Sequence, residues 1–116
     1  MNEINEVINL EKASCRNFDA NELMQLLKSK GFAVFASWGA SQFTVNDKND
    51  TTMFKMKVNG NHHKGYVYIF LSFLDLFNVY LTKFDDTIVN KIDGLYFDQL
   101  VNWIDEKIEW IDAYKS

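Results

Sequence analysis

The stretch TMFKMKV, residues 52–58, decides the fold of this 116-residue chain. Its apolar side chains Phe54, Met56 and Val58 alternate with Lys55 and Lys57. A period of two is typical of a β-strand that turns one face to the core and the other to water.

Two further runs of strand-forming residues follow this stretch, at 66–71 and 77–82. The run 66–71 is apolar on both faces, which predicts a central place in the sheet. Two shorter strands are predicted before the stretch, at 32–36 and 42–46, on either side of a turn at residues 38–39. The sequence therefore predicts an antiparallel sheet of four to five strands.

A helix is predicted on each side of the strands. Asp19 can cap a first helix over about 20–30, Glu22 stands where a capping box needs an acid, and Gly31 suits the end of the helix. A second, long helix is predicted over about 97–114, because its apolar residues recur at helical spacing. They are Phe97, Leu100, Val101, Ile104, Ile108 and Ile111.

The predicted order of elements indicates one α+β domain with both helices on one face of the sheet. We expect a single domain over 1–116, with a folded core at 18–114 and a loosely docked N-terminal arm at 1–17. The length agrees with one domain, because a chain of this size buries enough surface for a single hydrophobic core.

Cysteine content and the N-terminal charge indicate where the protein works. Cys15 is the only cysteine, so the chain forms no internal disulfide. Glu3 and Glu6 give residues 1–10 the wrong charge for a signal peptide, and no run approaches the ~18 apolar residues of a membrane span. We expect a cytoplasmic protein without a membrane partner.

The residues that carry catalysis are not grouped in the sequence. His62 and His63 are adjacent, so in an extended segment their side chains point in opposite directions, and no carboxylate stands between Asp50 and Asp75. Cys15 has no evident base beside it, no serine lies in a GxSxG turn, and the glycines are scattered singly. We predict no enzymatic activity, no metal site and no cofactor.

Acidic residues recur along the second predicted helix, and two tryptophans spaced by seven share one flank of it. A stripe of this kind is suited to a protein partner, because tryptophan is frequent among binding hot spots. A plain solvent face, with the tryptophans covering the flank of the core, is the alternative interpretation. The predicted partner-binding residues are Asp98, Trp103, Asp105, Glu109, Trp110 and Asp112.

The net charge of −4 is the sum of two unlike regions. Residues 85–112 hold eight carboxylates against two lysines, a local charge of −6, whereas residues 48–83 hold five lysines against two carboxylates, a local charge of +3. Single-sign fields steer association with oppositely charged partners. We therefore predict a non-catalytic protein-interaction module that binds a basic protein surface.

The outer face of the sheet supports a different hypothesis. Lys55, Lys57, Tyr66, Tyr68 and Tyr80 share that face in the predicted strands. Aromatic rings beside lysines resemble the stacking platforms that hold single-stranded nucleic acid. The net negative charge and the single arginine speak against it, so nucleic-acid binding is the alternative function. Self-assembly through the same face is a third hypothesis.

Three segments resemble short uncharacterised proteins carried by bacterial phages and other mobile elements. They are HKGYVYI (63–69), LDLFNVYL (74–81) and YFDQLV (96–101), and the resemblance spans about 18–114. The resemblance implies no catalytic residue. It implies that the chain is an accessory protein acting on host or element proteins.

Overall fold

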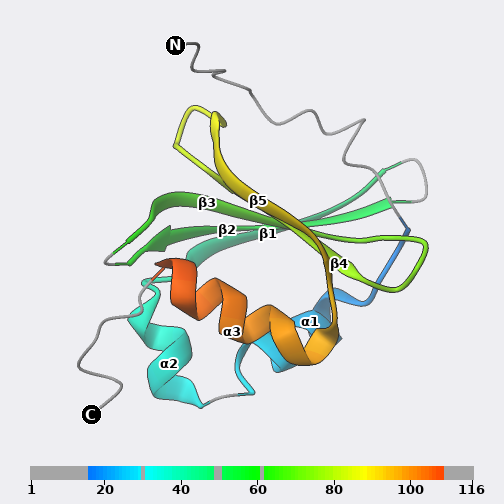
Figure 1. Ribbon diagram of the computed structural model, residues 1–116, viewed down its shortest axis with the longest axis horizontal. Helices are drawn as coiled ribbons and strands as arrows, with labels where there is room; N and C mark the ends of the chain where they lie inside the picture. Colours follow the sequence, from blue (N-terminus) through cyan, green and yellow to red (C-terminus); the bar gives the residue numbers. More distant parts are fainter. Residues whose placement is uncertain (1–15, 30, 49–50, 61, 109–116) are drawn as a thin grey trace.

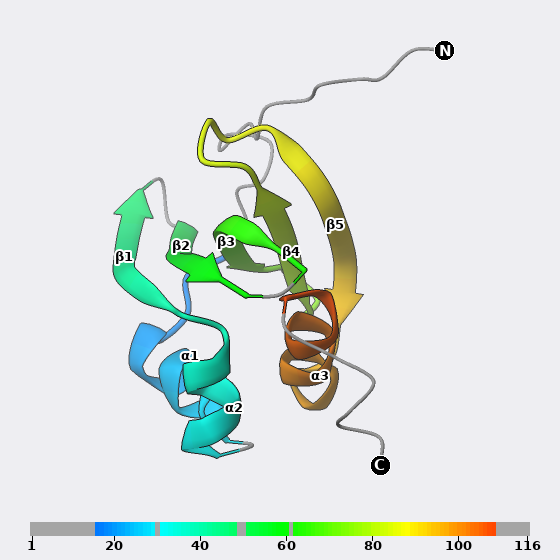
Figure 2. The same ribbon diagram turned by 90° about the vertical axis from the view of Figure 1, so that its left-hand side faces the viewer.

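The structure is a computed structural model that describes residues 16–29, 31–48, 51–60 and 62–108. Within these ranges it has two layers, an antiparallel sheet and a layer of three helices on one face of it (Figures 1 and 2). The α+β prediction, with the helices on one face, is confirmed. In chain order the elements are α1 (Ala20–Leu27), α2 (Phe32–Ser37), β1 (Ser41–Lys48), β2 (Thr51–Asn59), β3 (Lys64–Leu71), β4 (Phe77–Thr82), β5 (Ile88–Leu95) and α3 (Phe97–Ile108).

The five strands pair in the order β1-β2-β3-β4-β5, so each strand lies beside its neighbours in sequence. Every pairing is antiparallel, with Ile69 of β3 opposite Phe54 of β2 and Val79 of β4. The central position predicted for residues 66–71 is confirmed. The apolar character of this strand on both faces follows from its position, because the middle strand has the least access to solvent.

The hydrophobic core lies between the inner face of the sheet and the helices. The alternation in residues 52–58 places Phe54, Met56 and Val58 in it, all fully buried. The helices contribute large side chains that are equally buried, and burial of this kind is the main stabilising term in folding. The fully buried helix-layer residues are Leu27, Trp38, Leu100, Ile104 and Ile108.

The strand predicted at 32–36 is wrong, because residues Phe32–Ser37 form the short helix α2. In a strand, Phe35 and Trp38 would point to opposite faces. Three residues apart on a helical turn, they both face the core, and their ring centroids lie 5.5 Å apart. The apolar pattern of this short run suits a helix or a strand. Burial of both rings in the core favours the helix.

The fifth strand is β5, which the sequence did not indicate as a strand. Its residues Asn90, Lys91 and Asp93 are exposed, and only Leu95 is buried. Because β5 is an edge strand, it needs few apolar side chains. Its backbone hydrogen bonds to β4 hold it in the sheet. Irregularities in its register with β4 are typical of a protected edge.

The first helix begins as predicted and ends earlier. The Asp19 side chain accepts hydrogen bonds from the backbone N–H of Asn21 at 2.8 Å and of Glu22 at 3.4 Å, which confirms the cap. The helix ends at Leu27 with Lys28 as its C-cap, whereas Gly31, with φ of 113°, precedes α2. The glycine therefore separates two helices.

The N-terminal arm predicted at 1–17 is described only at Arg16 and Asn17. Arg16 lies between the ends of β2 and β3, where its N–H donates to the Leu71 carbonyl and its carbonyl accepts from Thr52. Residues 109–114 of the predicted second helix lie outside the described residues. Within the described part of the chain, no helix combines the length and the apolar character that spanning a bilayer requires.

Candidate interaction surfaces

The acidic stripe predicted on the closing helix is not a continuous surface in the described residues. Asp98 is exposed in the first turn of α3. Asp105 is only 7% exposed, and its carboxylate accepts a hydrogen bond from Trp38 Nε1 at 2.9 Å. Its predicted place on a solvated stripe is wrong, because Trp38, directly after α2, lies against the flank of α3 that a two-helix arrangement would leave open.

Of the two tryptophans in that prediction, only Trp103 lies in the described residues. Trp103 is half-buried at the border of the core, with Lys107 Nζ 6.0 Å from its ring centroid. Glu109, Trp110 and Asp112 lie outside the described residues. Of the six predicted partner-binding residues, Asp98 is thus the one that is both described and exposed.

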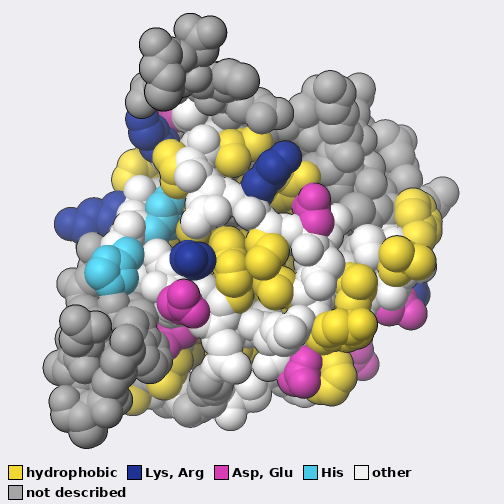
Figure 3. Space-filling model, in the orientation of Figure 1, with side chains coloured by type: hydrophobic (Ala, Val, Ile, Leu, Met, Phe, Trp, Pro, Cys, Tyr) yellow, Lys and Arg dark blue, Asp and Glu magenta, His cyan; other side chains and the backbone are white. Residues whose placement is uncertain are grey.

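Four large apolar side chains are exposed at one end of the sheet, and we call them the end patch. Phe73 and Leu74, in the turn between β3 and β4, are 80% and 81% exposed, and Tyr96 and Phe97, at the start of α3, are 59% and 68% exposed. They share one end because β4 begins beside the end of β5. Figure 3 shows hydrophobic and acidic side chains together along its right-hand edge.

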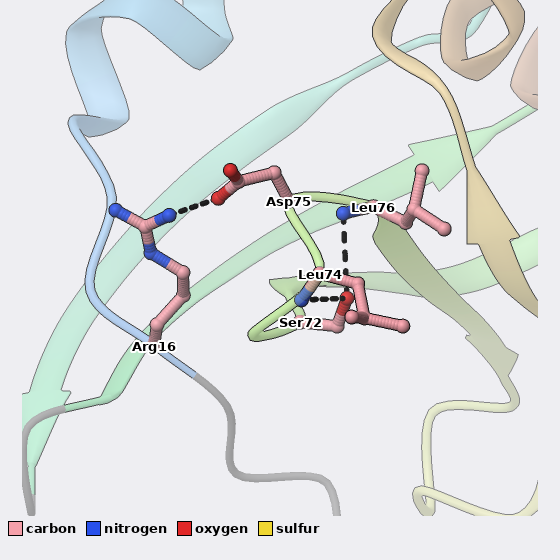
Figure 4. Close-up of polar contacts among 5 residues, drawn as sticks. All are labelled: Arg16, Ser72, Leu74, Asp75 and Leu76. Atoms are coloured by element: carbon pink, nitrogen blue, oxygen red, sulfur yellow. Dashed lines mark hydrogen bonds and ion pairs between the residues drawn. The ribbon is translucent and has the colours of Figure 1, made fainter.

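The turn that carries Phe73 and Leu74 is held by polar contacts (Figure 4). The Ser72 hydroxyl accepts hydrogen bonds from the backbone N–H of Leu74 and of Leu76, each at 3.3 Å. The Ser72 N–H donates to the Leu76 carbonyl at 2.8 Å, which closes the turn. The two apolar side chains are therefore presented to solvent by a defined backbone.

The second half of the patch is held by the beginning of α3. The N–H of Tyr96 donates to the Gln99 side-chain oxygen at 3.1 Å, and the N–H of Gln99 donates to the Tyr96 carbonyl at 2.9 Å. This exchange resembles a capping box, with glutamine in its usual place and tyrosine in that of serine or threonine. Phe97 is then the first residue of the helix.

Carboxylates border the end patch. Asp98 follows Phe97 and is exposed, as is Asp93 near the end of β5. Asp75, in the same turn as Phe73, forms an ion pair with Arg16. Asp93 and Asp98 thus give the patch an acidic rim.

Sequence reasoning missed the end patch. A signal was present, since the SFLDLF run (72–77) carries four large apolar residues where a turn is expected. Exposure does not follow from such a run, because the same residues would be buried if another segment covered the turn.

The outer face of the sheet does bring together the residues of the alternative prediction. Lys55 Nζ lies 4.0 Å from the Tyr66 ring centroid and 5.2 Å from that of Tyr68. Register places Lys55 opposite Tyr68, and Tyr68 opposite Tyr80. Lys57 Nζ lies 5.4 Å from the Phe84 ring centroid. Contacts of this kind are cation–π interactions.

Tyr68 is not available for stacking on that face. Its side chain is 3% exposed, and its hydroxyl donates a 2.5 Å hydrogen bond to Asp86 in the turn between β4 and β5. Burial, and next the bond to Asp86, raise the pKa of Tyr68 above its ordinary value. This tyrosine fixes the turn, and the accessible aromatic part of the face is smaller than predicted.

The two histidines are placed differently from one another. His62 is exposed, whereas His63 is buried with Nε2 3.3 Å from the Tyr66 carbonyl oxygen. Burial lowers the pKa of His63, against the opposing effect of backbone hydrogen bonds with Tyr66 and Thr82. In the described ranges, no three side chains of His, Cys, Asp and Glu converge as metal ligands would.

Acid is expected to weaken the fold through His63. Because the pKa of His63 is lowered in the folded state, the unfolded chain binds the proton first as the pH falls. The free energy of unfolding therefore decreases below the unfolded-state pKa of about 6.5. It levels off below the folded-state pKa. Urea unfolding at several pH values should show this slope between about pH 7 and 5. His63→Gln should reduce the slope and His62→Gln should keep it; equal slopes in the two variants would contradict the assignment.

Comparison with known proteins adds no relationship: no protein-family model, no curated protein and no solved structure matches the chain. The resemblance to proteins of phages and mobile elements stays a prediction.

Proposed function

We propose that this protein is a non-catalytic interaction module that binds a partner protein through the end patch. The observation that carries the proposal is the exposure of Phe73, Leu74, Tyr96 and Phe97, at 59–81%, on a defined turn and a defined helix start. Large apolar side chains exposed together at one end of a domain mark candidate interaction sites.

The acidic rim determines the chemistry of the proposed partner. Exposed Asp93 and Asp98 attract a positively charged segment, while the four apolar side chains need an apolar residue to cover them. The partner segment therefore combines lysine or arginine with a large apolar side chain. The proposal keeps the basic partner predicted from charge. It keeps Asp98 from the predicted stripe and replaces the rest of that stripe with the end patch.

The setting proposed for this module is the cytoplasm, on the ground of its single cysteine. An accessory role in a phage or mobile element, acting on host or element proteins, belongs to the same proposal.

Binding to a peptide library tests the proposal. We expect peptides that combine Lys or Arg with Leu or Phe to bind the full chain, and Phe73→Ser or Phe97→Ser to weaken binding by about tenfold or more, as loss of a central apolar anchor does. Phe84→Ser is the matched control, because Phe84 is 52% exposed at the other end of the sheet. Equal losses in all three variants, or hits without basic residues, would contradict the proposal.

Single-stranded nucleic acid is the second candidate ligand, and the position of Lys55 above the Tyr66 ring favours it. Tyr66 and Tyr80 are half-buried on that face, and Tyr68 is committed to Asp86. Binding there would rely on lysine contacts to phosphate, so it would weaken steeply with salt. Titration with a labelled oligonucleotide at two salt concentrations tests this candidate.

A further inference from the structure

From Arg16 the described chain leads into the helix layer. Residues after it lie on the helix side: the Phe18 N–H donates to the Thr52 hydroxyl, and Thr52 is buried on the inner face of β2. Figure 4 shows the described chain running from Arg16 toward α1. Arg16 itself lies between Thr52 and Leu71, in the plane of the strands.

The outer face carries a small apolar cluster around Tyr68 and Phe70. Phe70 is 1% exposed, although it points away from the helices. The described side chains packed on Tyr68 and Phe70 are Met53, Tyr66, Tyr80 and Ile88, which rise from the same face. Tyr68 and Phe70 therefore form the buried centre of an apolar cluster whose rim is half-buried.

The curvature of the sheet favours an occupant on this face. Figure 2 shows β1 and β5 bending away from the helix layer on either side of β3, so that the outer face is concave. Arg16 pairs with Leu71, the residue next to Phe70. A segment that ends at Arg16 therefore starts within reach of the cluster, since each extended residue spans about 3.3 Å.

The sequence of residues 1–15 is complementary to that face. Ile4, Val7 and Ile8 recur at spacings that place them on one side of a helix, and Glu3, Glu6 and Glu11 outnumber Lys12. The face offers apolar rings together with Lys55 and Lys57. Apolar burial and opposite charge favour the same pairing.

We propose that residues 1–15 dock on the outer face of the sheet, over Met53, Phe70 and Tyr80, and occupy the surface that an acidic ligand would otherwise use. This surface is distinct from the end patch, so the proposal does not depend on the proposed function. The segment acts as an internal competitor of nucleic acid, because both would contact the same lysines and rings.

Radical footprinting of the full chain tests the proposal. In the variant Ile4→Ser, Val7→Ser, Ile8→Ser, we expect Met53, Phe70 and Tyr80 to be oxidised about fivefold faster than in the unchanged protein, equivalent to about 1 kcal/mol of docking free energy. Asn2→Ser, Asn5→Ser, Asn9→Ser is the matched control, since it changes polar positions of the same segment without altering charge, and should leave the rates unchanged. Phe73 and Tyr96 serve as exposed internal references.

Four outcomes would overturn the proposal. Unchanged oxidation in the apolar variant would show that residues 1–15 do not cover the face. Equal increases in both variants would show that the apolar positions are not the contacts. Protection that falls on dilution, with sedimentation showing a dimer, would assign the face to a second copy. Tight binding of a labelled oligonucleotide by the unchanged chain, lost steeply between two salt concentrations, would assign it to nucleic acid.

Paramagnetic relaxation enhancement tests the docking of residues 1–15 directly, with the apolar residues of the segment unchanged. A spin label at Asn5→Cys, in a Cys15→Ser background, should broaden the ring signals of Phe70 and Tyr80 more than those of Trp38 on the helix side. Equal broadening on the two sides, or none on Phe70, would contradict the proposal.

Discussion

Replacing Trp38 with alanine is expected to lower the free energy of unfolding by about 3–5 kcal/mol, the range for truncating a large buried aromatic residue. The indole is fully buried between the helices and the sheet, with the Phe35 ring beside it. It joins α2 to α3 through the bond to Asp105. Removing it leaves a cavity and a buried carboxylate without its donor. Chemical denaturation followed by circular dichroism measures the change.

Two further variants separate the polar part of this effect from the packing part. Asp105→Leu leaves the indole N–H without its acceptor and should cost about 1–3 kcal/mol, whereas Asp105→Asn keeps an acceptor oxygen and should cost less. Replacing a buried carboxylate with an apolar group is sometimes neutral. If Asp105→Leu is as stable as the unchanged protein, the hydrogen bond does not stabilise the fold, and Trp38 acts by packing alone.

Gly65→Ala is expected to destabilise the protein by about 1–3 kcal/mol or more, because it overpacks the centre of the sheet. A Cβ atom at this position would lie 2.0 Å from the carbonyl oxygen of Thr82 and 3.1 Å from its carbonyl carbon. Both are backbone atoms of the neighbouring strand, so relief requires β3 and β4 to separate where Tyr66 pairs with Thr82. The same denaturation measurement applies.

Lys64→Ala is the control for this glycine. Lys64 is the exposed neighbour of Gly65 in β3, and a surface change of this kind typically stays within about 0.5 kcal/mol of neutral. If Gly65→Ala proves as stable as Lys64→Ala, the close approach of the two strands is not required by the fold.

Local pattern sufficed to predict the strands β1 to β4 and the starts of α1 and α3. A slip of one residue in 52–58 would turn Phe54, Met56 and Val58 to solvent, and the run at 66–71, apolar on both faces, suits the middle of a sheet. Asp19 capped its helix as expected because capping depends only on residues within one turn.

The edge strand β5 and the short helix α2 were not predictable in the same way. The run 32–37 suits a strand or a helix by itself, and the partners of Phe35 and Trp38 in the core decide between them. Residues 88–95 lack a strand pattern, and their pairing with β4 makes them a strand. In both cases the deciding interactions come from residues distant in sequence.

Composition and periodicity determined the α+β fold, with acidic residues gathered toward the closing helix and lysines in the sheet. Tertiary structure decided which side chains remain available for binding. Asp105 is buried because α2 brings Trp38 against it, and Phe73 and Phe97 are exposed because no described segment covers that end of the sheet. The physical reason is that secondary structure follows from neighbours along the chain, whereas exposure depends on what the folded chain places above each residue.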